Sequence, residues 1–329
     1  MRAVDPHGPE AAQRKGLIAF RDAAGPWLDA AEALLHERWA GEPPAPPVFI
    51  IGAPRTGSTI LYQCLTGCWD FEYVSNVECI FHRHLLFAAR LRRALCGDGP
   101  HGCFTSCYGE TPGLDGPAEC GPLWYRWFPQ SRHSITTMDV GADVPAQMRG
   151  VLSAWLRCKA RPVLFKNMLM GLRLRVLALA FPEALFLWCR RDTARTARSL
   201  LRARRELADG RWWSMRPAEY ERLLSLPPEE QVVGQVVHVE REIADGLERL
   251  YPGRSMVLEY ERFCAGPERE LERVRRWLAG FGVDVRRREG APLPPIAESS
   301  APQDDPVLMR LQRLAGKEAD AVRESPTAD

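Results

Sequence analysis

The sequence predicts an α/β fold with three layers, in which a parallel sheet is flanked by helices on both sides. Two short, continuously apolar runs, residues 48–51 and 184–189, are typical of strands that are buried on both faces. Such runs alternate along the chain with segments of helical periodicity. This alternation is typical of parallel strands that are joined by crossover helices.

The pattern indicates a single domain over residues 1–329, with a core at about 46–285. Residues 10–40 have apolar side chains at helical spacing and are expected to form one or two helices on the core. The proline-rich stretch 42–47 is a stiff spacer into the first strand. The tail 286–329 is rich in Pro, Ser and Asp, and we expect it to be partly flexible.

The elements follow in order. We expect a strand at 48–51, a helix at about 58–65, a helical segment at 71–95, a strand at 162–167, a helix at 168–181, a strand at 184–189, an arginine-rich helix from about 193, a strand at 255–260 and a helix at about 267–280.

The Gly-, Pro- and Cys-rich segment 96–123 looks irregular, as a lid or a binding wall would. The aromatic run Trp124–Phe128 follows it and is either core packing or the wall of an acceptor pocket. Trp212, Trp213 and Tyr220, in an expected helical insert, are candidates for a second wall.

The formal charge is only +2, so the overall charge gives no reason to expect nucleic-acid binding. No run approaches the roughly 18 apolar residues of a membrane span. The first residues lack the apolar core of a signal peptide. The sequence therefore predicts a cytoplasmic protein without a membrane span.

Four of the ten cysteines, Cys96, Cys103, Cys107 and Cys120, lie in the Gly-rich segment near His101. Their spacing lacks the second matching pair that is typical of structural zinc sites. Free thiols are favoured over a disulfide or a zinc site, and no metal is expected in the protein.

The most informative motif is the loop from Gly52 to Thr59, between the first strand and its helix. Its spacing is that of a phosphate-binding loop, G-x-x-x-x-G-K-[ST], but Ser58 occupies the lysine position. Arg55 supplies a basic group from inside the loop. Backbone N–H groups and the helix N-terminus could hold an anion there, with the planar Arg55 fork on its oxygens.

Polar residues follow two further predicted strands, at Lys166–Asn167 and at Arg190–Asp192. Because ligands of open α/β sheets bind at the carboxyl ends of the strands, these groups should converge with the loop. Ser199 lies eight residues after Arg191, about two helical turns along, so both could reach one phosphate. The sequence therefore predicts a cationic site for a ligand with more than one anionic group.

These features resemble the sulfotransferases that use 3′-phosphoadenosine 5′-phosphosulfate. The run 53–59 is similar to the 5′-phosphosulfate loop of that family, with arginine where its eukaryotic cytosolic branch has lysine. A buried strand followed by Arg191 and Ser199 is similar to the family's 3′-phosphate motif. The resemblance covers about 46–285, and residues 259–263 look like a segment of bacterial members.

The resemblance implies a P-loop-like fold and in-line transfer of a sulfuryl group, without a metal. The acceptor would be a hydroxyl, less often an amine, of a small molecule, natural product, glycan or glycolipid. Arg55 would stabilise charge on the leaving adenosine 3′,5′-bisphosphate, and Lys166 resembles the second catalytic lysine of the cytosolic branch. The general-base histidine of that branch would fall at Met168, which cannot accept a proton.

Glu78, about 20 residues after the loop, is then the first candidate base, since carboxylates in that region serve as base in other branches. A solvated structural role for Glu78 stays open. His82 and His84 are further candidates, and His133 is a more distant one. The predicted catalytic residues are Arg55, Glu78, Lys166 and His82, and the predicted donor-binding residues are Pro54, Arg55, Thr56, Gly57, Ser58, Thr59, Arg191 and Ser199.

Two other functions fit parts of the pattern. A small-molecule kinase with a phosphate loop would need a lysine at Ser58 and an acid for Mg²⁺, for which Asp192 is the candidate. A non-catalytic nucleotide-binding relative is the second alternative. The sequence does not identify the acceptor, the residues that hold adenine, or the oligomeric state.

Overall fold

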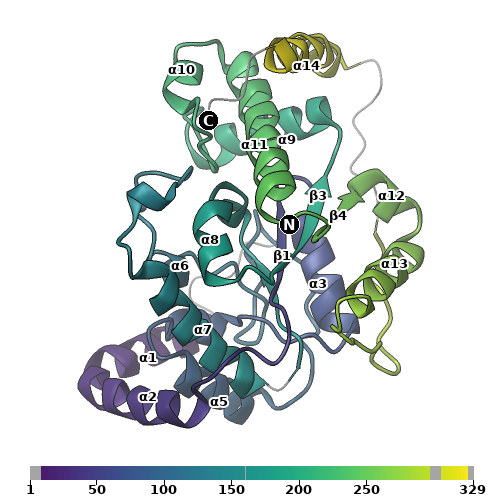
Figure 1. Cartoon of the computed structure of the whole chain (residues 1–329). Helices are drawn as coiled ribbons and strands as arrows, with labels where there is room; N and C mark the ends of the chain where they lie inside the picture. The colour runs from purple at the N-terminus through teal and green to yellow at the C-terminus, as the bar shows by residue number, and fades with distance from the viewer. Residues whose placement is uncertain (1–8, 160, 297–304, 325–329) are drawn as a thin grey trace.

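The computed structural model describes residues 9–159, 161–296 and 305–324. At its centre is a four-stranded, entirely parallel sheet in the order β2-β1-β3-β4 (Figure 1). Helices cover both faces of the sheet, so the predicted three-layer α/β fold is confirmed. The strands are β1 (Val48–Gly52), β2 (Leu164–Lys166), β3 (Leu185–Arg190) and β4 (Ser255–Glu259).

The strand order places a switch point at β1. The chain leaves β1 to form β2 on one side of it, and then crosses to form β3 on the other side. At the carboxyl end of β1, Gly52 is paired with Cys189, and Ile50 is paired with Lys166. Crevices at such points are where open α/β sheets bind ligands, so the fold positions the loop after Gly52 as a binding element.

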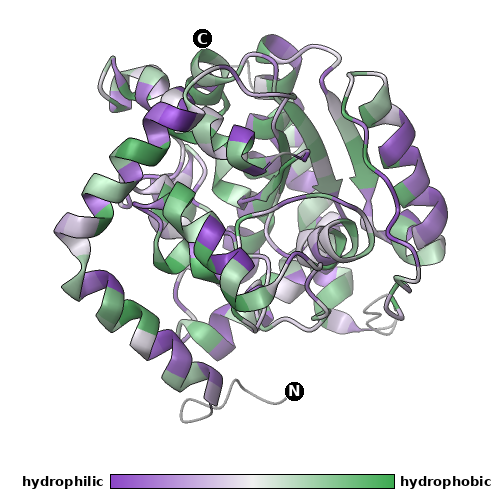
Figure 2. Ribbon diagram, turned by 90° about the horizontal axis from the view of Figure 1, so that it is seen from below, coloured by the Kyte–Doolittle hydropathy of each residue, from purple (hydrophilic) through white to green (hydrophobic). Residues whose placement is uncertain are grey.

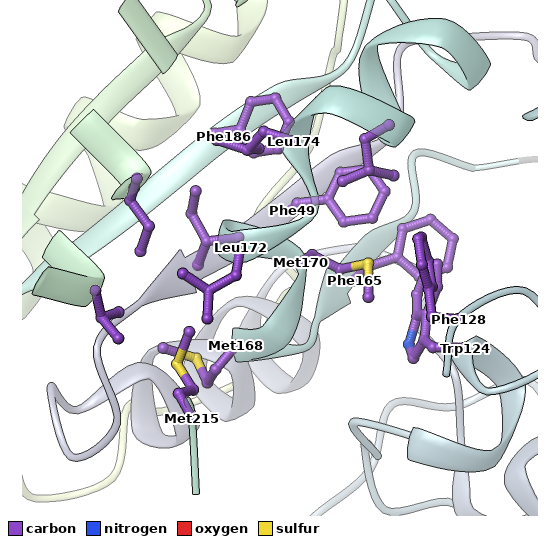
Figure 3. Close-up of a cluster of buried hydrophobic side chains, with 14 of the residues drawn as sticks. Phe49, Trp124, Phe128, Phe165, Met168, Met170, Leu172, Leu174, Phe186 and Met215 are labelled. Carbon is purple, nitrogen blue, oxygen red and sulfur yellow. The ribbon is translucent and has the colours of Figure 1, made fainter. Parts of the chain in front are cut away.

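The two faces of β1 belong to two different hydrophobic clusters. Phe49 points into the larger cluster, where its ring stacks on Phe165 and Phe186 with centroids 5.0 and 5.7 Å away (Figure 3). Val48 and Ile50 point into the other cluster. This alternation follows from the period of two residues in a strand.

The helices are also divided between the two hydrophobic clusters. The larger cluster includes residues of α7 (Val144–Lys159), α8 (Leu174–Ala180), α9 (Thr193–Leu207) and α11 (Pro228–Leu250). The other includes residues of α3 (Ser58–Cys68) and α13 (Pro267–Ala279). Figure 2 shows the strands mainly in the colour of apolar residues, while helices carry polar stretches.

Residues 9–39 form α1 (Pro9–Ala23) and α2 (Gly25–Trp39), which pack against α4 (Asn76–Ile80) and α5 (Leu85–Cys96). Glu32 on α2 accepts hydrogen bonds from the backbone N–H groups of Leu86 and Phe87, both at 2.9 Å. The carboxylate therefore satisfies N–H groups in the first turn of α5, which have no partner within their own helix.

Two expected helices are interrupted. The predicted helical segment 71–95 consists of α4 and α5 with a turn between them, because Ser75 and Glu78 start α4 with a capping box and the short helix ends before Phe81. The predicted helix 168–181 begins as the 3₁₀ helix η2 (Met168–Leu172), since the Asn167 side chain accepts a hydrogen bond from the N–H of Leu169. It continues as α8 only after Arg173.

The expected helical insert around Trp212 and Trp213 is irregular up to α10 (Tyr220–Leu224). Gln235 on α11 holds it in place by donating to the carbonyl oxygens of Trp213 and Met215 at 3.0 and 2.7 Å. Side-chain hydrogen bonds to the backbone replace the helical ones here. The remaining short elements are α6 (Gly121–Trp124), the 3₁₀ helix η1 (Thr137–Asp139) and α12 (Tyr260–Ala265).

The tail contains a helix that the sequence did not indicate, α14 (Pro306–Glu324), which packs on α9 and α11. Leu308 and Leu311 on α14 are buried in the larger cluster. The expected flexibility of residues 297–304 and 325–329 lies outside the described residues. Within the described ranges, no helix has the length and apolar character needed to cross a membrane.

Candidate functional site

The loop between β1 and α3 has a backbone that depends on glycine. Gly52 and Gly57 have φ angles of +147° and +81°. A Cβ atom would lie 2.2 Å from the carbonyl oxygen of Cys189 at Gly52, and 2.2 Å from the Tyr260 ring at Gly57. Only a residue without a side chain fits either position. Arg55 also has a positive φ, +72°, which is unusual for a residue with a side chain and marks a tight loop.

The N-terminus of α3 opens onto this loop. Gly57, at the N-cap, has no side chain that could cap the helix, so the loop provides first-turn N–H groups of the kind that bind anions. Thr56 does not face the ligand position with its hydroxyl, which instead donates to the carbonyl oxygen of Ala53 at 2.8 Å. Thr56 is thus part of the loop's internal bracing.

A carboxylate on α11 holds the start of the loop from behind. Glu240 accepts a hydrogen bond from the N–H of Ala53 at 3.1 Å and pairs with Arg190 Nε at 3.2 Å. Burial is the main cause that raises the pKa of Glu240 to about 7. This residue ties the loop to the strand end of β3, and sequence reasoning did not identify it.

The structure brings the two predicted anion-binding motifs together. Arg55 donates from Nε to Ser199 Oγ at 3.0 Å, which links the loop to α9. Arg191 donates to the carbonyl oxygen of Arg55 at 3.3 Å, and its guanidinium lies 4.5 Å from the centre of the Tyr260 ring. The same ring packs against Gly57. Tyr260, in the segment 259–263, therefore packs against both the loop and Arg191.

Lys166, at the end of β2, completes this cationic group. Its Nζ donates to Thr59 Oγ1 at 3.0 Å and forms an ion pair with Glu119. The Lys166 side chain is 3% exposed, whereas that of Glu119 is 34% exposed. Asn167 donates from Nδ2 to the Glu119 carbonyl oxygen at 3.1 Å and so fixes the backbone that carries the carboxylate.

The irregular segment 96–123 contacts both Arg55 and Lys166. Tyr108 places its ring 5.1 Å from the Arg55 guanidinium, and its hydroxyl donates to Glu206 on α9. The ring also meets the Trp213 ring edge-on at 6.0 Å. Because Tyr108 and Glu119 both come from residues 96–123, that predicted lid or wall does lie over the loop. Burial lowers the pKa of the Arg55 guanidinium below its ordinary value.

Glu78, the first candidate base, lies in a different environment. Its side chain is 0% exposed, and Oε2 accepts from the Ser75 N–H and hydroxyl, both at 2.8 Å. Its other oxygen, Oε1, accepts from Trp155 Nε1 at 3.1 Å and pairs with Lys159 Nζ at 2.7 Å. All four of these partners are hydrogen-bond donors inside the protein. This geometry favours a structural role, and it also excludes the solvated position considered above.

The candidate histidines belong to other parts of the molecule. His82 lies in the turn between α4 and α5, with Nδ1 3.3 Å from the Cys79 carbonyl oxygen, and burial lowers its pKa. His84 pairs with Asp29 on α2 at 2.8 Å. His133 accepts a hydrogen bond from the Arg216 N–H. No contact in the described part of the chain joins these histidines to the loop.

The aromatic run is core packing. Trp124, Trp127 and Phe128 are 1%, 6% and 2% exposed and belong to the larger hydrophobic cluster. The ten cysteines are free thiols. No group of three or more metal-binding side chains occurs within residues 9–159, 161–296 and 305–324.

Asp192, the acid that a kinase would need, caps α9 instead. Its carboxylate accepts the N–H of Arg195 at 2.8 Å, and its own N–H donates to Glu261. The carboxylate is therefore used as a helix cap, which does not favour the kinase alternative.

Sequence reasoning missed Glu119 and Tyr108. Both lie in the irregular segment, where no periodicity predicts which side chain points to the site. The available signal was the expectation that the segment is a lid, combined with the fact that Glu119 is one of its few acids. A carboxylate that meets a strand-end lysine can be found only once the segment is folded over the sheet.

The site thus combines an uncapped helix N-terminus, the cations of Arg55, Arg191 and Lys166, and a partly exposed carboxylate. Such a site can bind a ligand with several anionic groups and can accept a proton beside it. A model of the sulfotransferase family matches residues 46–281. The chain belongs to the sulfotransferase family.

A comparison with solved structures found similar chains at low identity. Sulfotransferase STF9 from Mycobacterium avium is 14% identical, with 94% of this chain and 76% of that one covered and a TM-score of 0.49. The sulfotransferase domain of the Synechococcus PCC 7002 olefin synthase is 16% identical, covers 87% and 97%, and has a TM-score of 0.41. Sulfotransferase STF1 from Mycobacterium tuberculosis H37Rv is 13% identical, covers 74% and 69%, and has a TM-score of 0.46. The search of curated proteins found no match.

Proposed function

We propose that this sulfotransferase transfers the sulfuryl group of 3′-phosphoadenosine 5′-phosphosulfate to the hydroxyl of a small-molecule acceptor. The observation that carries the proposal is the hydrogen bond from Arg55 to Ser199, which unites a phosphate-type loop with a second polar site on α9. A donor with a 5′-phosphosulfate and a 3′-phosphate needs two adjoining anion sites. The Gly-only loop and the uncapped start of α3 fit the first of them.

In the proposed reaction, the acceptor oxygen forms a bond to sulfur while the bond from sulfur to the bridging phosphate oxygen breaks. Negative charge then develops on the leaving adenosine 3′,5′-bisphosphate. Arg55 and Lys166 are placed at the carboxyl ends of β1 and β2 and would stabilise that charge. Thr59 holds the Lys166 ammonium in position. Arg191 would bind the 3′-phosphate together with Ser199.

We propose Glu119 in place of Glu78 as the group that takes the acceptor proton. Glu119 meets Lys166 and is one third exposed, whereas Glu78 is sealed among four donors. A base must come within hydrogen-bond reach of the proton that it removes. Glu119 is partly exposed and would be open to an acceptor, whereas Glu78 is enclosed by its own partners.

The acceptor site would lie beside Tyr108 and Trp213, whose rings meet next to Arg55. Rings in that position provide an apolar wall, which suits a natural product with a hydroxyl better than a bare sugar. A cytoplasmic enzyme of secondary metabolism remains the expectation, and cell fractionation would test the location.

Ligand-induced stabilisation tests the donor. A ligand that binds only the folded protein raises its melting temperature. We expect a large shift with adenosine 3′,5′-bisphosphate, a small one with 5′-AMP and none with magnesium-ATP, and a reduced bisphosphate shift in Arg191→Ala. Equal shifts with all three ligands would contradict the proposal, and a shift with magnesium-ATP alone would indicate the kinase.

Transfer itself is tested with ³⁵S-labelled donor and a panel of phenols, alcohols and amines. Label in an acceptor would establish the reaction. Bisphosphate binding with no transfer to any acceptor class would indicate the non-catalytic relative instead. Lys166→Met, which keeps an unbranched side chain one atom shorter and removes its charge, should bind the bisphosphate more weakly and transfer label slowly.

A further inference from the structure

Arg173, between η2 and α8, is a fully buried arginine. Its side chain is 0% exposed, and its guanidinium lies 4.4 Å from the centre of the Phe128 ring. None of its three guanidinium nitrogens has a hydrogen-bond partner within the described residues. A buried charge is costly unless it is paired and hydrogen-bonded, so this position calls for an acceptor.

Another buried arginine shows how the fold normally meets this need. Arg204 on α9 is 1% exposed and lies 4.4 Å from the centre of the Trp212 ring. Its terminal nitrogens donate to the amide oxygens of Gln231 and Gln235 at 2.8 and 2.9 Å. Arg173 has the aromatic contact but lacks the oxygens. The difference between the two sites is therefore a missing acceptor.

The polar groups around Arg173 do not supply that acceptor. Two of them interact with Arg173 electrostatically: the Tyr125 phenol, which raises the pKa of Arg173, and His133, whose pKa Arg173 lowers. Burial is the first cause of both shifts, which bring Arg173 to about 10 and His133 to about 4. His133 is thus neutral, and its Nδ1 accepts the Arg216 N–H at 3.1 Å. The remaining ring proton is then on Nε2, where it can only donate.

We propose that Arg173 is the centre of a binding site for a small monovalent anion, a halide or a carboxylate group. The anion would accept hydrogen bonds from the guanidinium, while the Phe128 ring covers one face of that group. A single negative charge neutralises a single buried guanidinium and leaves no excess charge in the core. A dianion such as sulfate would leave an unpaired negative charge there.

The site is distinct from the donor loop. Arg173 follows η2, whereas Lys166 and Asn167 precede that helix and face Thr59 and Glu119. Figure 3 places Phe128 beside Trp124 and Phe165, and Met168 at the other end of the cluster, near Met215. An anion at Arg173 would therefore lie beside the Phe128 ring, which belongs to the larger hydrophobic cluster.

The test uses the full chain in buffer free of halide and carboxylate, with bromide and acetate as probes and sulfate at equal ionic strength as reference. We expect bromide or acetate to raise the melting temperature with a saturable dependence on concentration. Arg173→Met should abolish this response. Arg175→Met, at an exposed position two residues away, is the matched control and should respond like the unmodified protein.

Both anions could also occupy the donor loop, so Arg191→Ala is tested in parallel and should keep the response. A response that survives in Arg173→Met, or that is missing from the unmodified protein, would overturn the proposal. The shift with adenosine 3′,5′-bisphosphate should be unchanged in Arg173→Met. Failure of the anion site is thereby distinguished from failure of the proposed function.

Crystallography gives a second measurement that does not need a variant. A crystal grown or soaked in bromide should show an anomalous peak within hydrogen-bond distance of the Arg173 guanidinium. A peak in an acetate crystal at the same place would identify the carboxylate form. Density for protein or water alone at all three nitrogens, in both crystals, would contradict the site.

Discussion

The protein contains two Lys–Glu ion pairs, Lys159–Glu78 and Lys166–Glu119, whose carboxylates lie in different environments. Lys159 and Glu78 are both sealed, with side chains 6% and 0% exposed. Lys166 is equally buried, at 3%, but Glu119 is 34% exposed and comes from the segment over the loop. Both pairs join an ammonium to a carboxylate. They differ in the other partners of the carboxylate and in its exposure to solvent.

The comparison shows that environment, rather than residue type or spacing from the loop, decides the role of a carboxylate. Glu78 on α4 accepts hydrogen bonds from Ser75, at the N-cap of α4, and from α7, where it also pairs with Lys159. Its carboxylate therefore links the start of α4 to α7. Glu119 has its lysine and an exposed side where an acceptor could approach. Four variants test how the environment of a charged side chain sets its role, three in these two pairs and one at His238.

The largest effect is expected for Glu119→Gln. Removal of a general base typically slows turnover by about 100- to 10 000-fold, and we expect a loss in that range with the bisphosphate shift retained. The measurement is steady-state transfer of labelled sulfuryl groups. Glu110→Gln, a change of the same kind in the same segment, is the control and should stay near normal. Full activity of Glu119→Gln would remove it from the mechanism.

Glu78→Gln should instead lower stability. Both oxygens of Glu78 face donors, so an amide NH₂ must point at one of them while Lys159 loses its nearest partner. Breaking a buried pair costs roughly 3–5 kcal/mol, and we expect the lower end because Glu72 still meets Lys159 at 3.2 Å. Denaturant unfolding measures the loss. Unchanged stability with lost turnover would return Glu78 to the role of base.

The double variant Glu78→Gln, Lys159→Met tests whether the stability lost in Glu78→Gln comes from the charge left on Lys159. The methionine removes the ammonium that lies over the Trp155 ring and that the single variant leaves with Glu72 alone. An incompletely paired buried charge is destabilising, so its removal should let the double variant regain about 1 kcal/mol or more. The same unfolding experiment decides it, and a further loss would mean that Lys159 is stabilised mainly by Glu72.

The smallest effect concerns His238, a buried side chain whose charge depends on pH. Both ring nitrogens of His238 face carboxylates, Glu219 at 3.1 Å and Glu318 of α14 at 2.9 Å. Burial lowers the pKa of His238, but the hydrogen bonds and charges of the two carboxylates outweigh burial and raise the pKa above its ordinary value. The stabilisation is complete below the unfolded value of about 6.5 and is lost as pH rises through the folded value.

His238→Gln should therefore flatten the fall in stability on the alkaline side of about pH 6.5. It should leave the fall at lower pH, because Glu242, with a pKa raised to about 7 by burial, also binds a proton more tightly in the folded state. Unfolding curves across this range measure both parts. An unchanged slope above pH 7 would show that His238 does not control the docking of α14.

Much of the fold could be predicted from local patterns. The apolar runs of β1 and β3 and the glycines of the loop depend on near neighbours in the sequence, and the structure has them where they were expected. The break at Arg173 and the helix α14 could not be predicted in this way. Both depend on packing partners that are distant along the chain.

The sequence by itself determined the parallel α/β order and the phosphate-type loop, with Arg55 inside it and Arg191 and Ser199 after a later strand. It could do so because apolar runs and glycine positions act within a few residues. Only the tertiary structure decided that Glu78 is enclosed and that Glu119 meets Lys166. Burial and pairing of a charge depend on which distant segments surround it, and no spacing along the chain records that.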